Sequence, residues 1–296
     1  MSNSKHYAAA IAAFVTWGFF SIPLRALKDY SAGEILYFRI LASVLVLAVI
    51  IFGFKRNDLR TNLTNLRSLA STQRNKVIAL TLVGGALLTV NWLTFIYIVN
   101  NINIKTASFS YLICPVITAV LGYVLIKEKM TTLQWIAVAL CTISCVLMGL
   151  NSTLELGYSF LTAFTYALYL ISQRKNQGFD RMIILGVQVL FSLLILTLFV
   201  NTLVSSVPSA TRFYAFIAMI AVIFTVVPLF LNLFALNRIN SATIGILMYV
   251  NPIINFTLAF VVFHEHINAI QLTGYAIIAV ALVIFNYPNF RRVVSK

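Results

Sequence analysis

Charge is what this sequence has least of. Only 9% of its 296 residues are charged, whereas about a quarter of the residues in an average soluble protein are. Hydrophobic residues make up 61% of the chain, which is more apolar surface than a soluble core of this length can bury. The composition therefore excludes a soluble globular domain, and it predicts that lipid surrounds most of the protein.

The hydrophobic residues are gathered in long segments, and ten of them are long enough to cross the roughly 20-residue span of a bilayer. Lipid cannot satisfy exposed backbone groups, so closed helices are expected; the strands of a barrel would give shorter, alternating segments. We predict an all-α integral membrane fold of ten transmembrane helices, at about 7–26, 35–54, 77–99, 106–126, 133–150, 154–172, 182–203, 213–236, 241–263 and 269–287.

The ten segments form two similar halves of five. An odd number of spans in each half places the second half upside down in the membrane, so we predict two inverted-topology repeats, 1–150 and 151–296, in one integral membrane domain. Such repeats are typical of alternating-access transporters with a site near the midplane. A shift of 137 positions aligns the halves, placing Asn100 on Asn237, Thr106 on Thr243, Pro115 on Pro252, Glu128 on Glu265 and Gln134 on Gln271.

The net charge of +14 could suggest nucleic acid, but the distribution of the basic residues favours another explanation. With a cytoplasmic N-terminus, 16 basic residues fall on the cytoplasmic side and four on the outer side, as the positive-inside rule requires. We predict cytoplasmic termini and no nucleic-acid partner. The inner residues are Lys5, Lys55, Arg56, Arg60, Arg67, Arg74, Lys76, Lys127, Lys129, Arg174, Lys175, Arg181, Arg238, Arg291, Arg292 and Lys296; the outer are Arg25, Lys28, Lys105 and Arg212.

One sizeable loop, residues 55–76, is basic and polar. Leu59, Leu63 and Leu66 recur at helical spacing, which predicts a short helix lying on the cytoplasmic membrane surface. A solvated linker is the alternative.

Short motifs in a fixed order resemble those of a known family across nearly the whole chain. The chain resembles the EamA group of the drug/metabolite transporter superfamily, and within it the RarD branch, often labelled chloramphenicol-sensitive proteins. Relatives often have Gly before the acidic residue that ends the fourth and ninth spans, whereas this chain has Lys127 and His264 at these positions. The motifs are Trp17-Gly18, Glu34-Ile35-Leu36 with Arg39, Asn91-Trp92-Leu93, Asn100-Asn101, Ala107-Ser108, Tyr111 with Pro115, Glu128 through Trp135, Val227-Pro228-Leu229, Arg238, Tyr249 with Pro252, and Glu265.

This resemblance implies a multi-pass permease of ten helices in two inverted five-helix repeats. It also implies residence in a bacterial inner membrane and transport of small metabolites or drugs. The resemblance gives a class of transporter and no particular solute.

Acidic residues are too few and too peripheral for a carboxylate at the membrane midplane. None of the seven falls at the middle of a predicted span, where ionisable groups usually mark proton or ion pathways. This disfavours proton-coupled antiport and favours passive or exchange transport, although Glu34 could still titrate. The seven are Asp29, Glu34, Asp58, Glu128, Glu155, Asp180 and Glu265.

Arg39 is the one basic residue predicted within a span. Its guanidinium could bind a substrate carboxylate through two hydrogen bonds, which would suit amino acids or organic anions. The structural alternative is a partner for Glu34 or for helix-end carbonyls near the outer boundary, with the side chain reaching toward the interface.

Three prolines within spans predict helix kinks: Pro115, Pro228 and Pro252. A proline frees a backbone carbonyl that a substrate or a neighbour can use. Because Pro115 and Pro252 are related by the repeat, we expect matching bends. Tyr111, Tyr249 and Asn251 beside these bends could line a central cavity; kinks that only help packing are the alternative.

Amides and aromatics within the spans complete the candidate site. Amides at depth bind substrates or join neighbouring helices by hydrogen bonds, and aromatic walls with a few polar groups suit a small-molecule site. Trp135 at a helix start is predicted to be an interfacial anchor. The predicted substrate-binding residues are Trp17, Arg39, Asn91, Trp92, Tyr97, Tyr111, Tyr166, Gln188, Tyr249 and Asn251; Asn232 and Asn255 are further amides within spans.

Metals and cofactors are not predicted. His264-Glu265-His266 resembles a metal cluster, but adjacent residues of a helix point in different directions, and the repeat places Lys127-Glu128-Lys129 at the same position. Cys114, Cys141 and Cys145 lie inside spans and offer neither a disulfide framework nor an exposed metal site.

The sequence therefore predicts a secondary transporter of small organic solutes, amino-acid-like ones first, working by alternating access between two repeats. Its partners would be a small-molecule solute and the lipid bilayer, as a monomer or a homodimer. The alternatives are an intramembrane enzyme and a non-transporting membrane sensor. An enzyme needs a nucleophile–base pair or a metal at depth, and the three His lie outside the spans, so we expect no enzyme.

Overall fold

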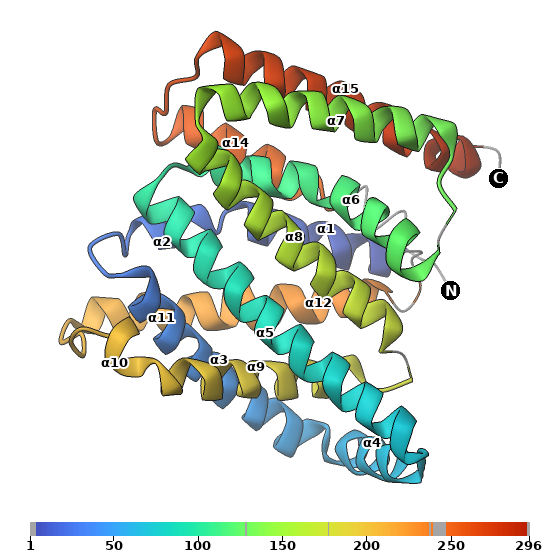
Figure 1. Ribbon diagram of the computed structural model, residues 1–296. Helices are drawn as coiled ribbons and strands as arrows, with labels where there is room; N and C mark the ends of the chain where they lie inside the picture. The colour runs from blue at the N-terminus through green and yellow to red at the C-terminus, as the bar shows by residue number, and fades with distance from the viewer. Residues whose placement is uncertain (1–3, 128, 177, 237, 239–246, 295–296) are drawn as a thin grey trace.

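A computed structural model describes residues 4–127, 129–176, 178–236, 238 and 247–294, and these residues form helices and no strand (Figure 1). The helices are α1 (Ser4–Gly18), α2 (Ser21–Arg25), α3 (Ala32–Phe54), α4 (Arg56–Ser68), α5 (Ser71–Asn101), α6 (Ile104–Ile126), α7 (Thr132–Asn151), α8 (Thr153–Lys175), α9 (Arg181–Leu198), α10 (Val200–Leu203), α11 (Thr211–Ala221), the π-helical turn Val222–Val226, α12 (Val227–Leu236), α14 (Val250–Val261) and α15 (Ala269–Val294).

Length and composition make this a multi-pass membrane protein. Seven helical segments of the described chain are long and apolar enough to cross a bilayer: Ser4–Arg25, Ala32–Phe54, Ser71–Asn101, Ile104–Ile126, Thr153–Gln173, Arg181–Leu198 and Thr211–Asn232. Three further apolar helices are shorter within the described residues: Thr132–Leu147, Val250–Val261 and Ala269–Phe285. The seven and the three fall on the ten hydrophobic segments of the sequence.

Two of the predicted spans are interrupted at a proline; a third, 182–203, has a turn at Phe199 between α9 and α10 without a proline. The predicted helix 7–26 stops at Gly18, because Pro23 has no N–H for the carbonyl of Phe19, which accepts instead from Ile22. In the predicted span 241–263, residues 241–246 lie outside the described part, and α14 begins only at Val250. There the carbonyl of Met248, four residues before Pro252, accepts from Asn251. The helix α6, by contrast, runs unbroken past Pro115.

The predicted short helix between the second and third spans is confirmed. It is α4, and none of its residues is buried. The helix α5 begins soon after it, at Ser71 rather than at residue 77, and so includes Arg74 and Lys76. At 1.5 Å per residue its 31 residues extend for about 46 Å, longer than the roughly 30 Å hydrocarbon layer.

The two halves of the chain interleave. In each half the first helix packs against the third and fourth helices of the other half: α1 against α12 and α14, and α8 against α5 and α6. Equivalent helices also meet directly, as α3 meets α9, α6 meets α14 and α7 meets α15; α7 and α15 lie side by side at the top of Figure 1. Each of these contacts between the halves therefore has an equivalent contact when the two halves are exchanged.

Local backbone features recur at the same 137-residue shift. Lys127 and His264 are the only non-glycine residues of the described chain with positive φ, at 59° and 50°. This is the conformation that glycine adopts at least cost after a helix, and it is where the family resemblance leads one to expect glycine. The helices that follow both start with a cap in which a Gln at the third position closes back on the chain, Gln134 onto Thr131 and Gln271 onto Asn268.

An ion pair fixes the end of α3 to the start of α9. The Nζ of Lys55 donates to Asp180 at 2.5 Å and to Asp58 at 3.1 Å. Asp180 also caps α9 by accepting from the N–H of Met182 and of Ile183. Burial alone would lower the pKa of the Lys55 ammonium, but the hydrogen bonds to Asp180 and Asp58 outweigh it, so the pKa is raised above 10.5.

Two substitutions of Asp180 separate the ion pair from the cap. Asp180→Asn keeps a capping oxygen and should lower the free energy of unfolding by less than about 1 kcal/mol, the range for a partly exposed pair. Asp180→Ala also removes the cap and should cost about 1 kcal/mol more. Thermal unfolding in detergent at neutral pH measures both values.

The pH dependence follows from the raised pKa of Lys55. A cationic group whose pKa is higher in the folded state stabilises it fully below its unfolded pKa of 10.5, and the stabilisation is lost as the pH rises through the folded pKa. The difference between the parent protein and Asp180→Asn should therefore persist at neutral pH and shrink above pH 10.5. A difference that stays constant into alkaline pH would contradict this assignment.

Candidate functional site

A narrow cavity lies where helices of both halves meet. Its volume is about 50 Å³, room for a few water molecules at roughly 10–15 Å³ each. Most of its wall is aromatic, with three polar or charged groups, Arg39, Thr225 and Asn251. The lining residues are Phe14, Trp17, Phe20, Arg39, Leu88, Trp92, Phe95, Tyr111, Tyr166, Tyr169, Phe224, Thr225, Leu229, Met248 and Asn251.

Pro228 shapes one wall of this cavity. In a regular helix the carbonyl of Phe224 would accept from residue 228, but a proline has no N–H to give. The indole Nε1 of Trp17 donates to that carbonyl instead, at 3.1 Å. The turn before Pro228 is π-helical, and the hydroxyl of Thr225 donates to the carbonyl of Ile220 five residues back. The Phe224 carbonyl, which Pro228 leaves without its helical partner, thus connects α1 to the cavity wall.

Arg39 lies in the cavity wall and does not reach the outer boundary. Its side chain is buried, with 2% of the residue exposed, and its Nε donates to the hydroxyl of Thr225 at 2.9 Å. The alternative of a partnership with Glu34 is wrong, because Glu34 belongs to a capping box with Ser31 at the start of α3. Glu34 lies five residues before Arg39, at the start of α3, where its carboxylate accepts from the backbone N–H of Ser31.

Tyr111 and Asn91 connect the cavity to the packing behind it. The hydroxyl of Tyr111 donates to Asn91 Oδ1 at 3.4 Å, a long hydrogen bond, and Asn91 Nδ2 donates to the carbonyl of Thr162 on α8 at 2.8 Å. The Tyr111 ring meets Phe95 and Tyr166 edge to face. Asn91 therefore links helices behind the cavity and holds a wall residue in place.

The structure gathers six of the ten predicted site residues around this cavity and places the other four elsewhere. Trp17, Arg39, Trp92, Tyr111, Tyr166 and Asn251 line it, and Asn91, Tyr97, Gln188 and Tyr249 do not.

Tyr97 and Gln188 occupy opposite surroundings. Tyr97 is 39% exposed and packs its ring against Tyr158 at a centroid distance of 5.3 Å. Gln188 is fully buried, and its amide nitrogen lies against Gly84 where α9 meets α5. Both of the Gln188 amide atoms lack a hydrogen-bond partner among the described residues.

Sequence reasoning missed nine lining residues, most of them apolar. A Phe that faces a cavity and a Phe that faces lipid look alike in a segment that is hydrophobic all round. Thr225 had a usable signal, because it stands three residues before Pro228 and a hydroxyl there can take part in the disturbed turn. The missed residues are Phe14, Phe20, Leu88, Phe95, Tyr169, Phe224, Thr225, Leu229 and Met248.

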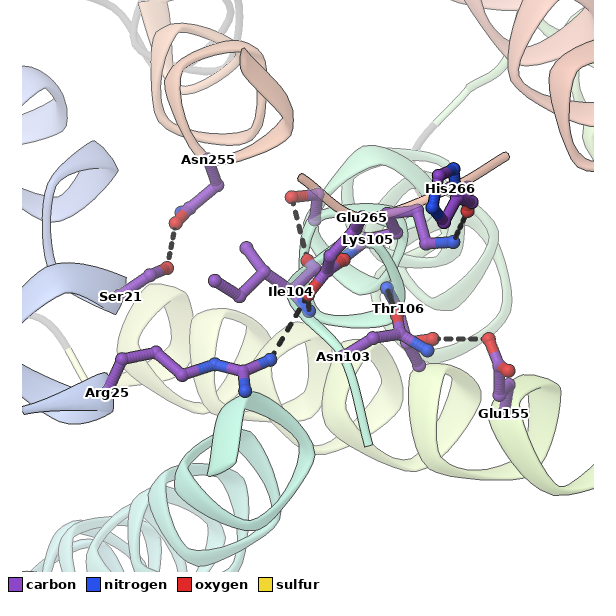
Figure 2. Close-up of polar contacts among 11 residues, drawn as sticks. Ser21, Arg25, Asn103, Ile104, Lys105, Thr106, Glu155, Asn255, Glu265 and His266 are labelled. Atoms are coloured by element: carbon purple, nitrogen blue, oxygen red, sulfur yellow. Dashed lines mark hydrogen bonds and ion pairs between the residues drawn. The ribbon is translucent and has the colours of Figure 1, made fainter. Parts of the chain in front are cut away.

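Glu265 organises a polar network at one end of the molecule (Figure 2). Its Oε1 accepts from the backbone N–H of Ile104 at 2.8 Å and from Arg25 at 3.1 Å, and its Oε2 accepts from the N–H of Lys105 at 3.1 Å. One carboxylate of the second half thus caps α6 of the first half and pairs with the last residue of α2. An anion at a helix N-terminus also interacts favourably with the helix dipole.

The neighbouring polar groups extend this network. Thr106 donates to Glu155 Oε2 at 2.6 Å, at the start of α8, and the ammonium of Lys105 donates to the carbonyl of His266. Among the described residues, no three His, Cys, Asp or Glu side chains are grouped to hold a metal. Glu128, the repeat counterpart of Glu265, lies outside the described residues.

Dense packing separates the network from the cavity. On α5 the residues beyond Phe95 toward this end include Ile96, Ile98 and Val99, and all three are fully buried. On α6 every residue from Ile104 to Ser110 is buried. The cavity is therefore closed toward the end that carries Glu265.

Comparison with known proteins assigns the family. The model of the EamA-like transporter family matches the chain twice, over residues 4–150 and 153–287. The chain belongs to this family. The predicted resemblance to EamA-type, RarD-like transporters is confirmed.

The relatives of this EamA-family chain match nearly all of its length. An uncharacterized transporter of Pseudomonas aeruginosa is 29% identical, with 97% of this chain and 95% of that protein covered. The RarD protein of Escherichia coli is 28% identical, with 93% and 92% covered. A solved crystal structure shares the fold, with a TM-score of 0.63 at 14% identity, covering 96% of this chain and 98% of the other. The EamA-family chain is thus a bacterial-type, multi-pass membrane transporter.

Proposed function

We propose that the protein carries small organic solutes, amino-acid-like metabolites or drugs, across a bacterial inner membrane by alternating access. In this proposal ten spans form two inverted five-helix repeats, 1–150 and 151–296, and the cavity around Arg39 is the solute site. The single observation that carries the proposal is a cavity walled by both halves and closed by dense packing toward the end that carries Glu265. The exchange-related packing of the halves supports the inverted repeat.

The charges orient this arrangement. The side of α4 holds the basic surplus, which favours the cytoplasm, so both termini would be cytoplasmic. The end that carries Arg25, Lys105 and Glu265 would then face outward. The cavity in this conformation would be shut to the outside.

Transport requires the cavity to widen. At about 50 Å³ it holds water molecules and is too small for an organic solute without rearrangement. Rocking of the interleaved halves would separate the helices at one end and then at the other. Exchange of one solute for another fits a described cavity wall that contains no carboxylate to carry a coupled proton.

The test is exchange of radiolabelled solutes by purified protein in liposomes, with a panel of amino acids and other small metabolites. We expect saturable exchange of at least one solute class. Flat uptake across the panel, for protein that is folded and inserted, would overturn the proposal.

A matched pair of tryptophan substitutions separates the cavity from the lipid face. Leu229 lines the cavity, whereas its neighbour Phe230 is 46% exposed. Leu229→Trp fills the cavity and should abolish exchange, and Phe230→Trp should leave the rate near that of the parent. Equal rates for the two variants would place the solute route elsewhere.

A further inference from the structure

The guanidinium of Arg39 carries a buried positive charge with an unused donor. Its Nε is taken by Thr225, while its Nη1 has no hydrogen-bond partner among the described residues. A buried donor left without a partner destabilises the structure, and a charged donor does so more strongly. Such a group, 2% exposed in the wall of a cavity, calls for a ligand that accepts.

Two aromatic rings lie against this guanidinium. Its central carbon lies 4.8 Å from the ring centre of Phe20 and 4.9 Å from that of Trp92. Cation–π contacts offset only part of the cost of an isolated buried charge. Nη1 is buried in this conformation, so a ligand reaches it when the cavity widens, and a flat carboxylate matches the planar donors of a guanidinium best.

The described wall of the cavity offers no counter-charge. It contains no Asp or Glu, and Arg39 is its one cationic side chain. A singly charged anion would neutralise the site, a dianion would leave a surplus negative charge, and a cation would be repelled. The charge balance thus selects a monoanion.

A hydrogen-bond chain prepares a second donor. The hydroxyl of Ser21 donates to Asn255 Oδ1, and Asn255 Nδ2 donates to Asn251 Oδ1 at 2.7 Å (Figure 2 shows the first of these contacts). Because the oxygen of Asn251 is occupied, its Nδ2 is the atom that can turn toward the cavity it lines. Both the amide and the guanidinium therefore present donors, which favour an acceptor-only ligand.

We propose that this cavity, once widened, binds a monocarboxylate carried on a flat aromatic ring, with the carboxylate on Arg39 Nη1 and the ring among the aromatic walls, chiefly Trp17, Tyr111 and Tyr166. The ring would stack or meet these side chains edge to face, as aromatic groups do with each other. This assignment rests on the proposed function and names its solute class.

Tryptophan fluorescence reports binding at this cavity. The chain has three tryptophans, of which Trp17 and Trp92 line the cavity and Trp135 is on the surface. In a Trp135→Phe background in lipid nanodiscs, benzoate, benzamide and benzylammonium are titrated. These probes share the ring and differ in charge. We expect saturable quenching by benzoate, binding of benzamide weaker by about tenfold or more, as the loss of one charged hydrogen bond predicts, and none by benzylammonium.

Variants of Arg39 test whether its guanidinium recognises the negative charge of the ligand. Arg39→Gln should reduce the preference for benzoate over benzamide to about one, and Arg39→Lys should keep part of it because the charge remains. Arg212→Gln is the control, since Arg212 lies at the start of α11, outside the cavity. Thr225→Val keeps the charge, removes the Nε partner and should weaken benzoate less than Arg39→Gln does, which provides a second test if Arg39→Gln does not fold.

Two results would overturn this inference: equal affinity of the parent for benzoate and benzamide, or an unchanged preference in Arg39→Gln. Exchange of neutral or cationic solutes in liposomes without benzoate binding would sink this inference and leave the transport proposal standing. Benzoate binding without any solute exchange would support this inference and contradict the transport proposal.

Discussion

Replacing Glu265 by glutamine is expected to open the end of the protein that Figure 2 shows. Glutamine has nearly the same shape but no charge, and only one of its two terminal atoms accepts. It therefore loses the ion pair with Arg25 and one of the two backbone caps on α6. Hydrogen bonds to a charged group contribute about 1.5–3 kcal/mol each, of which the partly exposed Arg25 lies at the low end.

The size of the effect follows from this loss. If about 2 kcal/mol of closure is removed, the population with this end open rises by roughly thirtyfold. Ala107, fully buried on α6 between the network and the cavity, is the place to observe it. In a variant without native cysteines, Ala107→Cys should be unreactive to maleimide in the parent and react at least tenfold faster with Glu265→Gln, by the same arithmetic.

Glu34→Gln is the matched control. Glu34 also caps a helix with its carboxylate, but that carboxylate accepts from Ser31 in the same turn, and the contact of the Ser31 hydroxyl with Leu203 of α10 does not involve it. This variant loses a local cap and should leave the labelling rate of Ala107→Cys unchanged. If both variants accelerate the labelling of Ala107→Cys equally, the loss of any helix cap loosens this end, and Glu265 has no specific role in keeping it closed.

A valine at Gly85 is expected to separate α5 from α9 and to destabilise the protein strongly. A Cβ on Gly85 would lie 2.9 Å from the backbone carbonyl of Gln188 and 3.2 Å from the ring of Phe191. The carbonyl is part of α9 and cannot turn aside as a side chain can. The hydroxyl of Ser192 also donates to the Gly85 carbonyl at 3.1 Å, so this contact is lost when the helices move apart.

Overpacking of this kind costs about 3 kcal/mol, and the melting temperature should fall by about 6–12 °C. Gly157→Val is the control, because a Cβ at Gly157, also within a long helix, meets nothing within 4 Å. Both variants are compared by thermal unfolding in the same detergent. A melting temperature of Gly85→Val within 2 °C of the control, less than about 1 kcal/mol, would show that α5 and α9 can shift without cost.

The sequence was sufficient for the class of fold and for part of the site. Helix positions followed from long apolar runs, and the repeat shift anticipated Lys127 and His264 as equivalent positions, which share a left-handed backbone. Polar and indole-bearing residues in apolar segments are rare enough to single out, so Trp17, Arg39 and Asn251 were found. They line the cavity.

The other residues of the site could not be predicted, because they depend on the direction in which each side chain points. Nothing in the sequence distinguishes Phe20 and Phe95 from the other phenylalanines, of which the chain has 23 in all. Gln188 and Asn91 were singled out as amides, but packing between helices decides whether an amide meets a cavity or a neighbouring backbone. Tyr97 is the opposite case: it stands two residues after Phe95, about 200° around α5, so its ring points away from the cavity that Trp92 and Phe95 line.

Interleaving also governs the order in which this protein can be assembled. The principal partners of α1 are α12 and α14, more than 200 residues further along the chain. At about 5–20 residues per second the ribosome needs roughly 10–40 s to make them. Throughout that time the newly inserted α1, with its small-residue face of Ala9, Ala10 and Ala13, has only lipid or an insertion chaperone to pack against. Biogenesis of the first half therefore ends only when the second half is nearly complete.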